Sequence, residues 1–344
     1  MRHPDYVIAG AGLIGLSLAL ELECRGARVV LLEAGRAARQ TTFAAAGMLA
    51  VEDASNPAAL YEFARLSASL YPGFLARIGE LCGLIVPFQT STTYEAGVPV
   101  DDPLRSTSSK ALGLLADDAP PFTLLAEHSI DPRQLGAALH RAVLATSIDL
   151  RENTAMGRLT MGPSSIEVET PNGTLSAAMF IDCMGTWSPA PVVPRKGQML
   201  AVKMPVDFEL DAVVRTNEVY IVPRTAGPYR GRAIIGATVE DVGFDLTVHA
   251  ADVLALHARA VRLLPGLAEA EFLEAWAGLR PATADGLPLL GFAPGQPRYL
   301  VATGHFRNSI LLAPGTARVL AQLLAGEAPA INLAAFSPMR FASV

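Results

Sequence analysis

The glycine pattern GAGLIG at residues 10–15 places the tightest constraint on the fold of this chain. A short apolar run precedes it at residues 5–9, and residues 13–25 follow with the composition of a helix. Residues 28–33 form a second apolar run, which ends at Glu33. This order predicts a strand, a tight turn, a helix and a strand, which together make a βαβ unit with a parallel pair.

Each glycine of the pattern has a physical reason. Gly10 suits the tight turn, Gly12 lets a backbone approach a pyrophosphate, and Gly15 lets the helix pack closely on the strand. The helix that begins at Leu13 and Ile14 offers free N–H groups and a partial positive charge to phosphates. A chance glycine-rich turn is the alternative, but the strand-turn-helix context favours dinucleotide binding.

Glu33, followed by Ala34, lies where dinucleotide-binding folds hold the ribose. Its carboxylate would accept hydrogen bonds from both ribose hydroxyls and repel a 2′-phosphate, which argues against NADP. Residues 39–49, RQTTFAAAGML, bear on the choice between NAD and FAD. Their small side chains would let a backbone lie against a flat ligand, and Thr41 and Thr42 could bind phosphate or ribityl oxygens. An alanine-rich helix is the alternative.

Composition excludes several classes of protein. The chain has 344 residues and a formal net charge of -6 without a basic block, so we expect no nucleic acid partner. The three cysteines and six histidines lack metal or redox spacing, which predicts a reducing, cytoplasmic setting and no metal. Asp5 interrupts the N-terminal apolar run, so we expect no signal peptide. No apolar run reaches the roughly 20 residues of a membrane span.

The rest of the pattern is an α/β nucleotide-binding domain interrupted by a β-rich insertion. Asp131 and Pro132 suit the N-cap and the first turn of a helix. Apolar spacing predicts helices at 57–81, 131–145, 248–264 and 310–325, a hairpin around 171–173, and strands within 191–240 and at 299–303.

Polar residues interrupt three apolar stretches. Arg280, if buried, needs an anionic partner, which could be Asp285 or a substrate carboxylate held by two parallel hydrogen bonds. Tyr220 is either a core tyrosine or a hydrogen-bond donor. GHFRNSILLAP, residues 304–314, leads from a strand through a turn into an apolar helix, with free backbone N–H groups at the helix start. Arg307 in this turn points either toward a cavity or into solvent.

Several segments occur in the order of a known family: TTFAAAGML (41–49), DCMGTWS (182–188), VPRKGQML (193–200), VYIVPR (219–224), WAGLRPATADGLPLLG (276–291) and GHFRNSILLAP (304–314). With the N-terminal βαβ unit they span nearly the whole chain. The chain resembles the D-amino-acid-oxidase superfamily of FAD-dependent amine oxidases, and within it the glycine oxidase branch.

The resemblance implies an α/β fold with a Rossmann-like FAD-binding domain of the GR2 type and a β-rich antiparallel substrate domain. The implied FAD-binding domain comprises 1–84, 128–190 and 275–344, and the substrate domain comprises 85–127 and 191–274. No Cys or His falls where related oxidases attach flavin, so we expect noncovalent FAD. Further cofactor contacts are implied for Ala46, Gly47, Met48, Met156, Gly185, His305, Phe306, Arg307, Asn308, Ser309, Ile310 and Leu311.

The implied activity is oxidation of glycine or a closely related amino acid to the imine, giving a 2-oxo acid, ammonia and, with dioxygen as acceptor, hydrogen peroxide. Arg280 and Tyr220 would hold the substrate carboxylate, and Arg307 would assist. Alternatives are a D-amino acid or sarcosine-type oxidase or dehydrogenase with another acceptor, an NAD-linked dehydrogenase, and a flavin-binding scaffold without turnover. The family often forms dimers or tetramers, so we expect a homo-oligomer as one option.

The sequence departs from the glycine oxidase pattern in places. Ser309 stands where that branch usually has glycine, so a left-handed backbone there would be strained. Glu218 shares a strand face with Tyr220 and is expected either near the cavity, where it could attract an amine, or as a rim charge. Met156 replaces a branched aliphatic residue beside the adenine. Residues 85–127 match weakly and could shape the cavity entrance.

Overall fold

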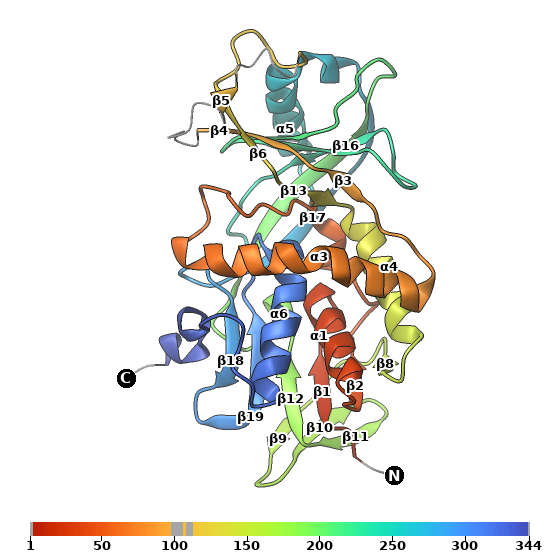
Figure 1. Cartoon of the computed structure of the whole chain (residues 1–344), viewed down its shortest axis with the longest axis vertical. Helices are drawn as coiled ribbons and strands as arrows, with labels where there is room; N and C mark the ends of the chain where they lie inside the picture. The colour runs from red at the N-terminus through yellow and green to blue at the C-terminus, as the bar shows by residue number, and fades with distance from the viewer. Residues whose placement is uncertain (1–2, 98–105, 108–112, 343–344) are drawn as a thin grey trace.

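The structure is a computed structural model that describes residues 3–97, 106–107 and 113–342. Two large sheets lie one above the other along the long axis of the molecule, and both chain ends lie in the lower half (Figure 1). Part of the weakly matching stretch 85–127 falls outside the described residues. Within the described ranges, no helix is long and apolar enough to cross a membrane.

The lower sheet contains the predicted βαβ unit. Its strand order is β18 (Leu289–Ala293), β19 (Gln296–Thr303), β12 (Met179–Asp182), β1 (Tyr6–Ala9), β2 (Val29–Leu32) and β8 (Asp149–Arg151). Neighbouring strands are parallel except that β18 runs antiparallel to β19. Helix α1 (Leu13–Cys24) joins β1 to β2, so the predicted unit with its parallel pair is confirmed.

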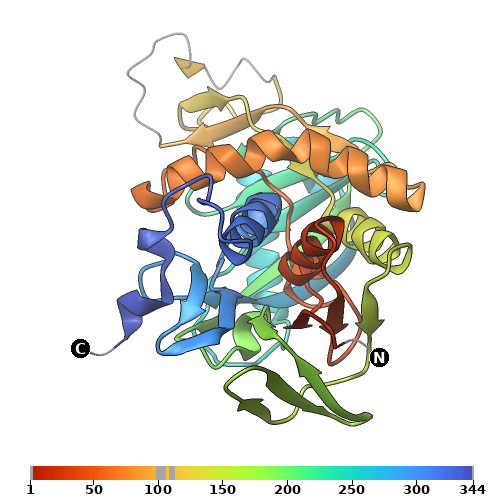
Figure 2. The ribbon, with the colours of Figure 1, turned by 60° about the horizontal axis from the view of Figure 1, so that its bottom comes forward.

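Helices cover one face of this sheet in two layers. Helices α1, α4 (Pro132–Leu144) and α6 (Ser309–Leu324) lie on the sheet, and α3 (Tyr61–Cys82) runs across them (Figure 2). The Asp131 carboxylate accepts hydrogen bonds from the N–H groups of the first turn of α4, which confirms the predicted cap. A three-stranded antiparallel sheet also lies in the lower half, formed by β9 (Leu159–Met161), β10 (Ile166–Thr170) and β11 (Gly173–Ala177).

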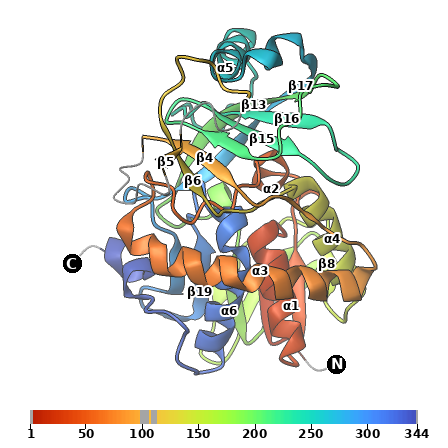
Figure 3. The ribbon, with the colours of Figure 1, turned by 45° about the horizontal axis from the view of Figure 1, so that its top comes forward.

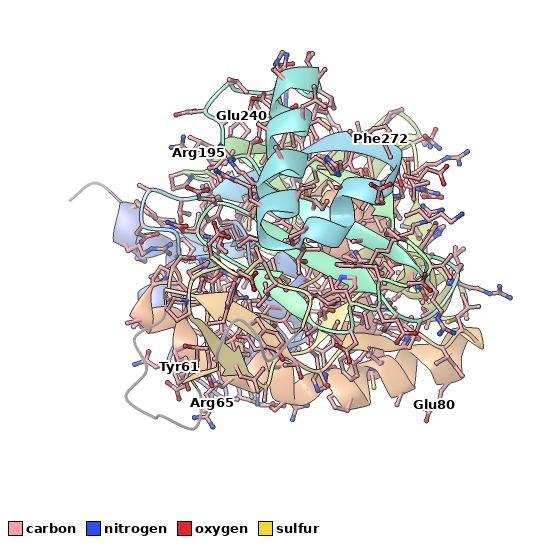
Figure 4. All side chains as sticks on the ribbon, turned by 90° about the horizontal axis from the view of Figure 1, so that it is seen from above. Tyr61, Arg65, Glu80, Arg195, Glu240 and Phe272 are labelled. Atoms are coloured by element: carbon pink, nitrogen blue, oxygen red, sulfur yellow. The ribbon has the colours of Figure 1, made fainter. Side chains whose placement is uncertain are left out.

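The upper sheet is largely antiparallel. Its order is β17 (Glu271–Ala282), β13 (Val193–Lys203), β16 (Arg232–Gly236), β15 (Tyr220–Arg224), β14 (Val213–Arg215), β4 (Thr93–Ala96), β6 (Phe122–Leu125) and β5 (Ser106–Thr107). Helix α5 (Ala250–Leu263) covers its outer face, over a separate apolar core (Figure 3). Seen from above, α5 lies over this sheet, and Tyr61 and Glu80 mark the two ends of α3 (Figure 4). Two short strands, β3 (Phe88–Thr90) and β7 (Ser129–Ile130), form a separate pair.

Helix α6 contains a break that α3 completes. Pro314 has no N–H, so the carbonyl of Ile310 loses its usual donor within the helix. The hydroxyl of Tyr71 donates to that carbonyl instead. The Ser67 hydroxyl donates to the Leu311 carbonyl over 2.6 Å and accepts from the N–H of Gly315 over 2.9 Å. Side chains of α3 therefore supply the hydrogen bonds that the first turns of α6 lack.

The α/β fold class is confirmed, with a mostly parallel lower sheet and a β-rich upper sheet. The domain boundaries remain a prediction. All strands of the lower sheet fall within the proposed FAD-binding segments, but β17 runs without interruption across the proposed boundary at residue 275. The first residues of β17 thus belong to one proposed domain and its last residues to the other.

Candidate active site

The first cavity lies where β1 and β2 end and α1 begins. It has a volume of about 500 Å³. It is lined by predicted cofactor residues Gly10, Gly12, Leu13, Ile14, Glu33, Ala34, Thr41, Thr42, Met156, Gly185, His305 and Ser309. This position, outside the carboxyl ends of parallel strands and at a helix N-terminus, is where open α/β sheets bind nucleotides.

The three glycines of the turn differ in what surrounds them. Gly10 has φ +99°, and a Cβ there would lie 2.4 Å from the Cys183 carbonyl oxygen. A Cβ on Gly15 would lie 1.9 Å from the Gly10 carbonyl oxygen, so this glycine permits close packing of α1 on β1. At Gly12 the nearest atom is the Thr42 hydroxyl, at 3.7 Å. Its free side faces the cavity, which leaves room for a ligand to approach the backbone.

Side chains around the cavity are oriented by backbone groups. The Glu33 carboxylate accepts from the N–H groups of Ala11 and Gly35, each over 2.9 Å. A carboxylate has about four acceptor positions, so it can still accept from ribose hydroxyls. The Thr42 hydroxyl accepts from the Leu13 N–H over 3.0 Å, and the Thr41 hydroxyl donates to the Leu279 carbonyl. Both threonines line the cavity, but these hydrogen bonds join parts of the protein and do not involve a ligand.

The turn before α6 forms the far wall. The N–H of Phe306 donates to the Pro281 carbonyl, and the N–H of Asn308 donates to the His305 carbonyl. Of the free backbone N–H groups expected around the helix start, those of Phe306 and Asn308 are therefore occupied. Because the first intrahelical bond runs from Leu312 to Asn308, the N–H groups of the first turn of α6 precede the helical ladder.

One expectation for this turn needs correction. Ser309 is the first residue of α6 and carries no left-handed backbone, so the predicted strain at this position is wrong. Within this turn, the non-glycine residue with a left-handed backbone is Phe306, with φ +46°. Burial lowers the pKa of His305 to about 3, so its ring is neutral. Its Nε2 lies 3.0 Å from the Thr316 hydroxyl. Because the ring is neutral, the partial positive charge at this wall comes from the N-terminus of α6.

A second, smaller cavity of about 80 Å³ adjoins the first, and both are lined by Thr41 and Ser309. Arg280 and Tyr220 reach it from β17 and β15 of the upper sheet, and Arg307 reaches it from the turn. It is also lined by Ala46, Gly47, Met48, Asp53, Met199, Phe306, Asn308 and Ile310. The three predicted substrate residues thus meet in one cavity, although they come from separate parts of the chain. Leu311, a predicted cofactor contact, is buried in the main core beside neither cavity.

Arg280 is held by carbonyl groups. Its Nη1 donates to the Thr238 carbonyl over 3.2 Å and, more weakly, to the Lys196 carbonyl over 3.4 Å. No carboxylate among the described residues forms an ion pair with it. Asp285, the alternative partner, lies 2.7 Å from Arg340 instead. The alternative of an ion pair between Arg280 and Asp285 is therefore wrong. The charge of Arg280 faces the cavity without an anion among the described residues.

Electrostatics in the second cavity follow from burial and two neighbouring cations. Burial lowers the pKa of Arg280; Tyr220 raises it, and the cation of Arg307 lowers it. Burial raises the pKa of Tyr220 above its ordinary value, although both arginines oppose the shift. Tyr220 is therefore a neutral phenol that can donate, and its hydroxyl lies 3.1 Å from the Met199 sulfur.

Two glycines of the upper sheet make room for these side chains. A Cβ on Gly197 of β13 would lie 2.2 Å from the Arg280 guanidinium. A Cβ on Gly236 of β16 would lie 2.6 Å from the Tyr220 hydroxyl. Sequence reasoning missed both. The available signal was a lone glycine inside a strand pattern, which often marks a close approach.

Glu218 and Arg307 lie in different surroundings: Glu218 is on the surface and Arg307 lines the second cavity. Glu218 is exposed and lies 3.5 Å from Arg262 of α5, so it is a surface charge rather than a cavity residue. Arg307 lines the second cavity, but its guanidinium bonds to Asp53 over 3.1 Å and to the Ser55 hydroxyl over 2.8 Å. Asp53 was not among the predicted residues.

The cavities fit FAD. The helix N-terminus and the open side of Gly12 suit a pyrophosphate, and the Glu33 carboxylate suits a ribose. Thr154, Ala155 and Met156 line the first cavity together with Glu33, and its other wall, at His305 and Ser309, adjoins the second cavity. A long ligand could thus extend from the βαβ turn to the substrate residues.

This fold and the two joined cavities define a dinucleotide-binding oxidoreductase. A model of the family described as FAD dependent oxidoreductase (DAO) matches residues 5–323, and the chain belongs to this family. FAD is accordingly its cofactor. Within the described residues, no cluster of three or more His, Cys, Asp or Glu is placed to hold a metal.

Proteins similar in sequence to this chain include glycine oxidases and bifunctional ThiO/ThiG proteins. The glycine oxidase of Geobacillus kaustophilus is 30% identical, over 98% of this chain and 97% of its own. The crystal structure of glycine oxidase from Geobacillus kaustophilus matches with a TM-score of 0.91 at 29% identity and covers 100% of both chains. The bifunctional protein ThiO/ThiG of Nostoc sp. is 34% identical over 93% of this chain, which spans 52% of that relative.

Proposed function

We propose that this protein oxidises the C–N bond of glycine or a closely related small amino acid. The observation that carries the proposal is Arg280. Its guanidinium is bound by carbonyls, has no carboxylate partner among the described residues, and faces a cavity beside the Tyr220 hydroxyl. A desolvated cation of this kind needs an anion, and the planar guanidinium matches a carboxylate.

The size of the cavity restricts the substrate. A cavity needs a volume of about 10–15 Å³ to hold one water molecule. A cavity of about 80 Å³ therefore suits a small molecule. Glycine and its close relatives are of this size and carry the carboxylate that Arg280 requires. Two relatives named glycine oxidase are consistent with a small amino acid as substrate.

The residues act by orientation and charge. FAD, when bound, supplies the two-electron acceptor for the hydride that leaves the substrate α-carbon. Arg280 and Tyr220 hold the carboxylate and thereby fix the α-carbon, and Arg307 lines the same cavity while paired with Asp53. No side chain needs to act as a base when the substrate amine is already neutral. The imine product then hydrolyses to a 2-oxo acid and ammonia, and dioxygen takes up the electrons as hydrogen peroxide.

The proposal is tested by mixing the FAD-loaded protein with glycine without oxygen and following the flavin absorbance. We expect bleaching of the oxidised band. A protein that stays yellow with glycine, but is bleached by sarcosine or a small D-amino acid, would contradict glycine as the substrate. Peroxide formation compared with dye reduction in the steady state then distinguishes an oxidase from a dehydrogenase.

A further inference from the structure

Two guanidinium groups line the second cavity, but they differ in their partners. Arg280 bonds to carbonyl oxygens and retains its full charge for a ligand. Arg307 has both terminal nitrogens engaged, Nη2 by the Asp53 carboxylate and Nη1 by the Ser55 hydroxyl. A cavity with two free guanidinium groups would suit a dicarboxylate, whereas this cavity offers one.

Asp53 is a firmly ionised partner. Its side chain is 9% exposed, and it lines the cavity together with Arg307. Burial would raise the pKa of Asp53, but the cation of Arg215, the Ser55 hydroxyl and the cation of Arg307 together hold it below its ordinary value. Its negative charge is thus present at neutral pH, and it compensates the charge of Arg307.

Asp53 is also attracted by a cation of the upper sheet. Arg215 of β14 is 3% exposed and lies 2.6 Å from the Glu95 carboxylate of β4 and 3.2 Å from that of Glu127. The Arg215 cation in turn attracts Asp53. This row of alternating charges leads from the upper sheet to Arg307, so an incoming anion would have to displace a buried and doubly attracted carboxylate.

We propose that Asp53 determines specificity by occupying Arg307, so that the cavity accepts substrates with one carboxylate and disfavours those with two. The inference rests on the proposed function, because it concerns the same cavity and its carboxylate-binding residues. Asp53 acts through Arg307 and is not itself a catalytic residue.

The test uses two non-amine acids, glycolate and malonate, titrated into FAD-loaded protein while flavin absorbance reports binding. In the wild-type protein we expect malonate to bind no more tightly than glycolate. Asp53→Asn should improve malonate binding relative to glycolate by about tenfold, because Arg307 becomes free for a second carboxylate. The double variant Asp53→Asn with Arg307→Met should lose this gain.

The control is Glu218→Gln, which removes a carboxylate of an ion pair on the protein surface and should leave the ratio unchanged. An unchanged ratio in folded, FAD-loaded Asp53→Asn would overturn the inference. So would a gain that persists without Arg307, or wild-type protein that already binds malonate tenfold more tightly, a measurement that needs no variant. Bleaching by glycine is scored separately, so failure of the proposed reaction and failure of this inference are distinguishable.

Discussion

Tightly packed glycines lie beside both cavities, but a side chain added at them would meet two different kinds of neighbour. At the cofactor cavity, a Cβ on Gly10 or Gly15 would meet backbone carbonyl oxygens. At the substrate cavity, a Cβ on Gly197 would meet the end of a long side chain. Backbone cannot yield without moving a helix or strand, whereas the end of a side chain can. Gly10 and Gly15 are therefore tied to the stability of the fold, whereas Gly197 is tied to the placement of Arg280.

Gly15→Ala should have the largest effect. Its Cβ would lie 1.9 Å from a carbonyl oxygen, so α1 must move away from β1. We expect a loss of about 3 kcal/mol in the free energy of unfolding and weak FAD retention. Denaturant unfolding and flavin content measure both. The control is Gly73→Ala, where no atom lies within 4 Å, and equal behaviour of the two variants would contradict the argument.

Arg280→Ala should damage the substrate cavity and spare the cofactor cavity. Removing the cation that faces the ligand should raise the KM for glycine roughly a hundredfold or more, in line with the loss of a buried charged pair. Flavin content should not change. Steady-state kinetics measures the KM, with Arg262→Ala on the surface of α5 as the control. Unchanged kinetics would refute the role of Arg280.

Gly197→Ala is the sharpest test of the comparison with Gly15. The added methyl group displaces the Arg280 guanidinium, 2.2 Å away, without a clash against backbone. We expect the KM to rise about tenfold while the free energy of unfolding changes by less than about 1 kcal/mol. If stability falls as far as in Gly15→Ala, the distinction between the two kinds of glycine is lost.

Tyr220→Phe should have the smallest effect. The variant loses one neutral donor to the carboxylate, so the KM should rise about tenfold or less. Because burial raises the pKa of Tyr220 above its ordinary value, the phenol keeps its proton at neutral and mildly alkaline pH. The ratio of wild-type to variant KM should therefore be constant from pH 7 to pH 9. A ratio that falls as pH rises would show that the phenol ionises in this range.

Parts of the structure with short-range causes could be predicted from the sequence. The βαβ unit and the Asp131 cap depend on residues within about one supersecondary unit, and both were found as expected. Arg280 could be singled out because a buried cation needs an anion. Asp53 could not, because its partner Arg307 lies 254 residues away and nothing in the sequence near either residue indicates the pair. The role of Gly197 likewise depends on Arg280 of β17, the neighbouring strand in the sheet, which is distant in the sequence.

The break in α6 has a consequence for how this protein can vary. Pro314 removes a donor, Tyr71 and Ser67 replace the missing bonds, and Gly315 has room for Ser67 because it lacks a side chain. None of these residues lines either cavity, yet together they fix the turn of α6 that begins at Ser309. Among homologues, these four positions should therefore be inherited as a set. A lineage that restores the donor at 314 no longer needs the hydroxyl at 71.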